Sequence, residues 1–219
     1  MATRAQRHGM QWERWAPAAG IAFVVLVIVG ISLDNTPDSK SSAAKFVSFY
    51  AKSSNRTQLI IEAYLLAVAA LGFLVFVVAL YNRLRSLAGE EDRFLATVIL
   101  ASGVLFTAML FAFGAASAAV AGAVTFGSQP VPPGDLARFV PQIGDALFLL
   151  YGMFSAAALV ACTSIASLRV GLLPRWLAWA GFVVAVAALF GVAFLPALLL
   201  LLWVLVVSIL LMLRPTEAR

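Results

Sequence analysis

Two carboxylates stand within or beside long apolar runs and are the residues best placed to do chemistry. Glu62 is the only charge inside one such run, and Asp145 begins another. An ionisable side chain within a membrane span is costly to bury and is typical of ion or proton pathways. Tyr64 and Tyr151 follow one or two helical turns further on. These four residues form a candidate polar site that could bind a cation or relay protons.

The same carboxylates also suit a structural role. Glu62 lies about one turn inside the boundary of its run, where it could meet Arg56 or interfacial water. Asp145 follows Pro141 and Gly144, a position that favours a helix N-cap. A carboxylate in the first turn of a helix is stabilised by the helix dipole whether or not it has a further role. Both interpretations stay open from the sequence.

The reactive residues that most enzymes need are missing. The chain has one cysteine, Cys162, and one histidine, His8, too few for an internal disulfide, a structural zinc site or a haem held by two imidazoles. Cys162 lies among alanines and is typical of a packing residue. The acidic run from Glu90 to Asp92 suits stabilisation of a helix N-terminus rather than metal binding. We therefore expect no enzyme activity, no metal and no cofactor.

The composition indicates a membrane protein. Of the 219 residues, 63% are hydrophobic and 11% are charged, whereas about a quarter of the residues in a soluble domain are charged. A soluble enzyme, a disordered chain and a nucleic-acid-binding module are thereby excluded. Because a membrane helix needs about 20 apolar residues, the charge-free runs predict an all-α transmembrane bundle with six spans in a single membrane domain, residues 1–219. The predicted spans are 16–33, 59–81, 94–120, 144–168, 176–194 and 197–213.

The last two spans share one charge-free run, and Pro196 lies near its middle. Proline removes a backbone donor and clashes with the preceding turn, so we expect a tight hairpin that turns at Leu195 and Pro196. One long kinked helix is the alternative.

The positive charges predict the orientation. With the N-terminus inside, ten Lys and Arg residues are cytoplasmic and five are outside, which favours two cytoplasmic termini. The outer loops are then 34–58 and 121–143. In the first, Ala43, Phe46, Val47 and Tyr50 recur at helical spacing and predict a short amphipathic surface helix. The second is rich in proline, and we expect an external loop in which Asp135–Val140 forms one or two helical turns.

Small residues at four-residue spacing indicate where helices pack closely in lipid. They place the third, fourth and fifth spans at the centre of the bundle. The sixth span is bulky all round and is expected to face lipid. The predicted packing positions are Gly103, Gly114, Ala118, Gly152, Ala156, Gly181 and Ala185.

Several short motifs resemble a group of uncharacterised six-helix bacterial integral membrane proteins. They are SAAKFVSFY (42–50), AYLL (63–66), YNRLR (81–85), LPRWLAW (173–179) and FLPA (194–197). The resemblance implies six helices in a bacterial cell membrane, and no assigned activity.

We expect a non-enzymatic protein that acts in a structural or accessory role, through helix, lipid or partner association. Its expected partners are the lipid bilayer and a membrane protein or a second copy of the chain, without nucleic acid. The alternative is a small ion or solute transporter or channel with an acidic vestibule.

Overall fold

The computed structural model describes residues 15–87, 89–190 and 194–213, and all of its regular structure in these ranges is helical. The all-α prediction is therefore confirmed for this part of the chain. The helices are α2 (Ala18–Leu33), α3 (Ala43–Ala51), α4 (Ser53–Leu87), the short 3-10 helix η1 (Glu90–Asp92), α5 (Arg93–Thr125), α6 (Gly134–Ala146), the π-helix η2 (Leu147–Gly152), α7 (Met153–Val170), α8 (Arg175–Leu189) and α9 (Phe194–Leu213).

Four helices are long and apolar enough to cross a membrane. They are Ser53–Leu87, Arg93–Thr125, the continuous helix Gly134–Val170, and Leu195–Leu213. The helices α2 and α8 are apolar but shorter, with 16 and 15 residues. The structure thus agrees with a multi-pass membrane protein, and the crossings by α2 and α8 remain a prediction.

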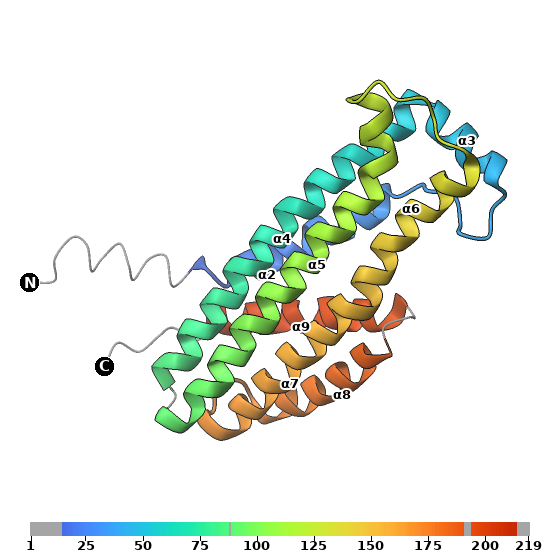
Figure 1. The fold of residues 1–219 in the computed structure, drawn as a ribbon. Helices are drawn as coiled ribbons and strands as arrows, with labels where there is room; N and C mark the ends of the chain where they lie inside the picture. The colour runs from blue at the N-terminus through green and yellow to red at the C-terminus, as the bar shows by residue number, and fades with distance from the viewer. Residues whose placement is uncertain (1–14, 88, 191–193, 214–219) are drawn as a thin grey trace, which may run out of the picture.

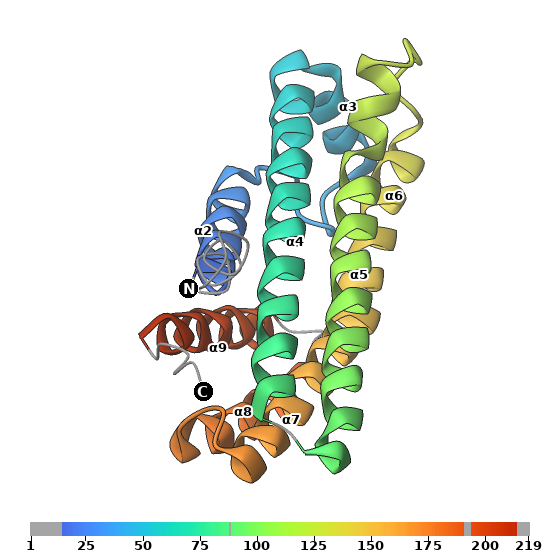
Figure 2. The same cartoon turned by 90° about the vertical axis from the view of Figure 1, so that its left-hand side faces the viewer.

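A long antiparallel pair, α4 and α5, forms the frame of the molecule (Figure 1). Their 35 and 33 residues correspond to lengths of about 50 Å at 1.5 Å per residue, which exceeds a hydrocarbon core about 30 Å thick. α2 packs on α4, and α6 and α7 follow α5 on its other side (Figure 2). α3 lies at one end of this frame, and the turn between α7 and α8 lies at the other.

The surplus length of α4 and α5 is packed into a second, smaller core. Beyond the main bundle, α3 and α6 close over the ends of α4 and α5, and we call residues 34–60 and 119–146 the cap. Its buried side chains are Phe46, Phe49, Tyr50, Leu59, Val120, Ala121 and Ala137. The predicted amphipathic helix at 43–50 is confirmed as α3, with Phe46 and Tyr50 buried, whereas Val47 of the predicted apolar face is exposed and Phe49 is buried in its place.

The predicted loop at 121–143 is largely helical, which corrects the sequence interpretation. α5 continues to Thr125 and α6 begins at Gly134, so only a short linker separates them. Pro141 lies inside α6 without ending it, although an internal proline removes one backbone hydrogen bond. α6 is strongly amphipathic, and the burial of Ala137 and Gly144 supplies the tertiary packing that outweighs this loss. α6 then runs through the π-helix into α7.

The last two helices are separate, so the alternative of one long kinked helix is wrong. α8 ends at Leu189 and α9 already begins at Phe194. Pro196 therefore lies in the first turn of α9 rather than in the connecting turn. The first turn of a helix tolerates proline because its N–H groups have no partner within the helix.

α9 is not a peripheral helix facing lipid, and this expectation was wrong. It packs against α2 and α8 and crosses α4 at a steep incline (Figures 1 and 2). Trp203, Val204 and Val207 are buried. Their bulk is accommodated because the partner helices offer glycines: Gly20 of α2 lies against Ser208, and Gly181 of α8 lies against Trp203.

Candidate functional site

Glu62 lies on the face of α4 that meets the C-terminal part of α2. Its side chain is half-buried, and a Cβ placed on Gly30 would lie 3.9 Å from its Cγ atom. The carboxylate atom Oε2 is buried and has no hydrogen-bonding partner among the described residues. Glu62 is therefore covered by protein on the α2 side, and no ion pair with it occurs among the described residues.

Arg56 is not the partner of Glu62, contrary to one sequence interpretation. Its guanidinium donates to the carbonyl oxygens of Tyr50 (2.6 Å) and Ala51 (3.0 Å), and to Oγ1 of Thr125 (3.2 Å). These carbonyls belong to the last turn of α3 and would otherwise lack partners. Arg56 thus fastens α3 to both α4 and α5.

Asp34, which follows α2, is the acid that the structure brings near the others. Its carboxylate interacts electrostatically with Glu62, with Asp145 and with Tyr50. The structure shows no direct contact between Glu62 and Asp145, and Asp145 is exposed. It lies near the end of α6 rather than at a helix N-cap, because the helix begins at Gly134, ten residues before the predicted start at 144.

The two tyrosines of the predicted site lie apart from Glu62. The exposed fractions of Tyr64 and Tyr151 are 68% and 63%, so both side chains point away from the protein. Tyr64 follows Glu62 by two positions, which places it on a different face of α4. The four predicted residues therefore do not converge on one enclosed site.

Tyr50 is a buried polar residue that the sequence did not single out as part of a site. It is fully buried in the cap, and its hydroxyl has no partner among the described residues. Burial, with a further contribution from the Asp34 carboxylate, raises the pKa of Tyr50 to about 12. The hydroxyl therefore stays protonated at physiological pH.

Polar residues at the start of α4 hold the α2–α3 connection in place. Gln58 donates to the carbonyl oxygen of Leu33 and accepts from Asn35 (2.8 Å). Asn55 donates to the carbonyl oxygen of Phe49 (3.0 Å). These bonds fix the course of the chain from α2 into α3.

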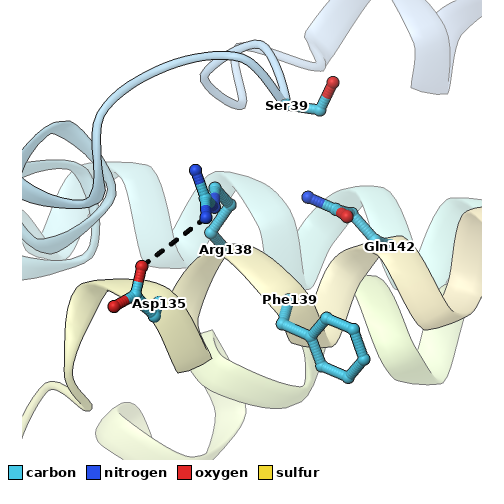
Figure 3. A pocket seen from close by; sticks show the side chains of 5 residues that line it. All are labelled: Ser39, Asp135, Arg138, Phe139 and Gln142. Atoms are coloured by element: carbon cyan, nitrogen blue, oxygen red, sulfur yellow. Dashed lines mark ion pairs between the residues drawn. The ribbon is translucent and has the colours of Figure 1, made fainter.

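A surface pocket of about 470 Å³ lies between this connection and α6. Its lining residues are Ser39, Asp135, Arg138, Phe139 and Gln142 (Figure 3). Arg138 and Gln142 extend from α6 toward the segment that carries Ser39, and Arg138 pairs with Asp135 at 3.5 Å. The sequence interpretation missed this pocket because it expected a loop with only one or two helical turns, at Asp135–Val140. The spacing of 135, 138, 139 and 142 is helical and was the available signal.

The predicted packing glycines lie at close helix contacts. A Cβ on Gly103 would collide with Val77 of α4 and approach Leu159 of α7, and a Cβ on Gly114 would lie 3.3 Å from Leu66. Gly152 lies against Met109. Among the predicted alanines, Ala156 and Ala185 are buried and Ala118 is half-buried.

At the end opposite the cap, one ion pair joins two helices. Arg169 near the end of α7 donates to Asp92 at 2.9 Å, just before α5. Asp92 thus links α5 to α7, and it makes no side-chain cap bond of its own. Cys162 is half-buried within α7. His8 and the N-terminal arginines lie outside the described residues.

No cluster of metal-ligating side chains occurs within residues 15–87, 89–190 and 194–213. Comparisons with protein-family models, with curated proteins and with solved structures find no match to this chain. The resemblance to six-helix bacterial proteins therefore stays a prediction.

Proposed function

We propose that the protein is a multi-pass protein of the bacterial plasma membrane that crosses the bilayer six times, with both termini in the cytoplasm and the cap outside. The excess of Lys and Arg in the segments opposite the cap supports this orientation. Trp176 and Trp179 are exposed at the start of α8, which supports a membrane interface there, because aromatic belts form at both interfaces. α2 and α8 are short for a crossing and would span with flanking residues at the interface.

We propose further that the protein acts by association rather than by catalysis. The observation that carries this proposal is the cap, which has its own buried core on two helices that project from the membrane bundle. Such a fixed, folded surface suits recognition of a lipid or of another membrane protein.

The test is extraction of the protein in native lipid followed by mass measurement of the intact assembly. We expect a bound partner chain or retained lipid in the wild type, with partial loss of it in Arg56→Ala, because that variant releases α3 from the cap. Lys52→Ala, an exposed neighbour, is the matched control. Recovery of the bare monomer alone would contradict the proposal.

A second candidate function, ion or proton transport, is favoured by one observation, the buried and unpartnered Oε2 of Glu62. Proteoliposomes under an imposed proton or cation gradient would test it. Flux in the wild type that is lost in Glu62→Gln and kept in Glu90→Gln would replace association with transport. Absence of flux in the wild type would remove this candidate.

A further inference from the structure

The pocket beside α6 presents both signs of charge and an apolar wall. The guanidinium of Arg138 and the carboxylate of Asp135 lie 3.5 Å apart. Ser39 and Gln142 add a hydroxyl and an amide, and Phe139 adds an aromatic ring. The volume of about 470 Å³ lies within the range of small-molecule sites, about 300–1,000 Å³.

This set of groups matches a ligand that carries both a phosphate and an ammonium group. A guanidinium has five N–H donors, and the single contact with Asp135 leaves most of them for phosphate oxygens. Gln142 lies one turn along the helix from Arg138, on the same side (Figure 3). The side chain of Asp135 is 86% exposed, so its carboxylate is accessible to the ammonium group of a ligand. A purely anionic ligand would meet repulsion from Asp135.

The apolar wall of the pocket continues toward the membrane bundle. Leu136, Phe139 and Ile143 are exposed large apolar residues on α6, spaced as one face of a helix. Exposed apolar side chains continue at Leu150 and Phe154, within the candidate membrane-spanning helix Gly134–Val170. An apolar face of this kind at a membrane boundary is suited to acyl chains.

We propose that this pocket binds the headgroup of a zwitterionic phospholipid of the phosphatidylethanolamine type. Arg138, Gln142 and Ser39 hold the phosphate, Asp135 holds the ammonium group, and the acyl chains follow Phe139 and Ile143. This inference rests on the proposed function, because it gives the associating cap a specific lipid partner and places α6 at the membrane surface.

The experiment is native mass spectrometry of the full chain, delipidated in detergent and then exposed to equal amounts of phosphatidylethanolamine and phosphatidylglycerol. The wild type is expected to retain phosphatidylethanolamine preferentially. Arg138→Gln is expected to lower this retention about tenfold, which corresponds to about 1.4 kcal/mol. Asp135→Asn is expected to reverse the preference toward phosphatidylglycerol, because it leaves Arg138 as an uncompensated cation.

Lys52→Gln, which removes an exposed cation outside the pocket, should bind both lipids as the wild type does. If Arg138→Gln lowers the melting temperature, Gln142→Ala provides a second test that changes no charge in the pocket. Equal retention of the two lipids by the wild type would overturn the proposal. Unchanged retention in both Arg138→Gln and Asp135→Asn would overturn it too. Full displacement of the lipid by soluble phosphoethanolamine would also overturn it, since the acyl chains would then contribute nothing.

The readout separates this inference from the proposed orientation. Lipid retention in detergent does not depend on which side of the membrane the cap occupies. If the orientation proves wrong but the lipid selectivity is preserved, the site lies in the other leaflet. If the orientation proves correct but the selectivity is lost, only the lipid site is refuted.

Discussion

At the scale of single residues, Tyr50 links the protonation of a side chain to the stability of the cap. Its pKa is raised to about 12 from the ordinary value of 10.0, so the protonated form is favoured in the folded state. The unfolded tyrosine ionises first as pH rises. The free energy of unfolding is therefore unaffected by this group below about pH 10. It falls by about 2–3 kcal/mol in total between about pH 10 and 12, as the unfolded tyrosine ionises and the folded one does not.

We predict that Tyr50→Phe removes this alkaline loss of stability and a late component of the tyrosinate absorbance titration. Below pH 10 the variant should be as stable as the wild type or slightly more so, because the hydroxyl it deletes is buried without a partner. Thermal unfolding at pH 8 and pH 11 would check both statements. A variant that destabilises at pH 8 by more than about 1 kcal/mol would indicate a hydrogen bond that this structure lacks.

Gly181 supports a second prediction at this scale. A Cβ placed there would collide with Oγ of Ser164 and lie 3.1 Å from Nε1 of Trp203. We expect Gly181→Ala to destabilise the protein by about 1–3 kcal/mol through overpacking. The melting temperature in detergent would report the loss.

The collision also predicts a rescue. Ser164→Ala deletes the offending Oγ, which is itself buried without a partner, and the remaining Cβ would lie 3.5 Å from the new methyl group. The double variant should recover most of the stability, which is a non-additive result expected only for residues in contact. Gly89→Ala, where an added Cβ meets nothing within 4 Å, is the control.

At the scale of elements, Arg56 of α4 fastens the C-terminal end of α3 to its neighbours. Arg56 bonds two carbonyl oxygens at the end of α3 and also reaches α5. Each hydrogen bond to a charged group contributes about 1.5–3 kcal/mol when well formed, and partial exposure of Arg56 lowers this value.

We therefore predict that Arg56→Ala raises amide hydrogen exchange in residues 43–51 by about 30-fold, equivalent to about 2 kcal/mol. Exchange around Ile99 and Phe106 of α5 and around Leu159 of α7 should not change, because these residues belong to the other core. Lys52→Ala should leave exchange in α3 unaltered. Faster exchange throughout both cores would show instead that the cap and the bundle unfold together.

At the scale of the whole molecule, the proposed six crossings can be tested by cysteine accessibility. Cys162 is the only cysteine, so Cys162→Ala gives a background for single cysteines at Lys52, Ser86 and Phe190, all exposed positions. We predict that an impermeant maleimide labels Lys52→Cys and Phe190→Cys in intact cells, and Ser86→Cys only after permeabilisation.

The outcome at Phe190 decides between two topologies. Phe190 follows the last residue of α8, so six crossings place it on the side of the cap. If it stays unreactive in both conditions while Lys52→Cys reacts as predicted, α8 and α9 form a hairpin that does not traverse the bilayer. The number of crossings would then be four.

Much of the fold could be predicted because hydrophobic runs and helical spacing are local properties. They predicted the helical class, the apolar spans and α3. They did not predict α6, since Pro141 and three nearby prolines disfavour a helix locally, and only packing on α5 and α3 restores it. The burial of α9 was missed for the same reason, because it depends on glycines of α2 and α8 that lie far away in the sequence.

The candidate site shows the same division. Glu62 could be singled out as a candidate because a single charge in an apolar run is visible in the sequence, and its role in a site stays a prediction. Its surroundings could not be predicted, since Asp34 and Gly30 reach it only through the packing of α2 on α4. The pocket beside α6 required both a helix and a distant segment at Ser39, and neither was apparent from local patterns.

The π-helix at Leu147–Gly152 sets the rotation of α6, in the cap, relative to α7, in the bundle. A π-turn accommodates one residue more than an α-turn, so it resets the angular phase of everything that follows along the helix by about 100°. Loss of one residue from this segment would leave a smooth helix of ordinary geometry. With α7 in place on α5, Ala137 would then rotate away from the cap core, and Gly144 would rotate away from Phe113 and Ala116 of α5. Deletion of one residue in this segment is therefore expected to rotate α6 and the cap relative to α7 and the bundle.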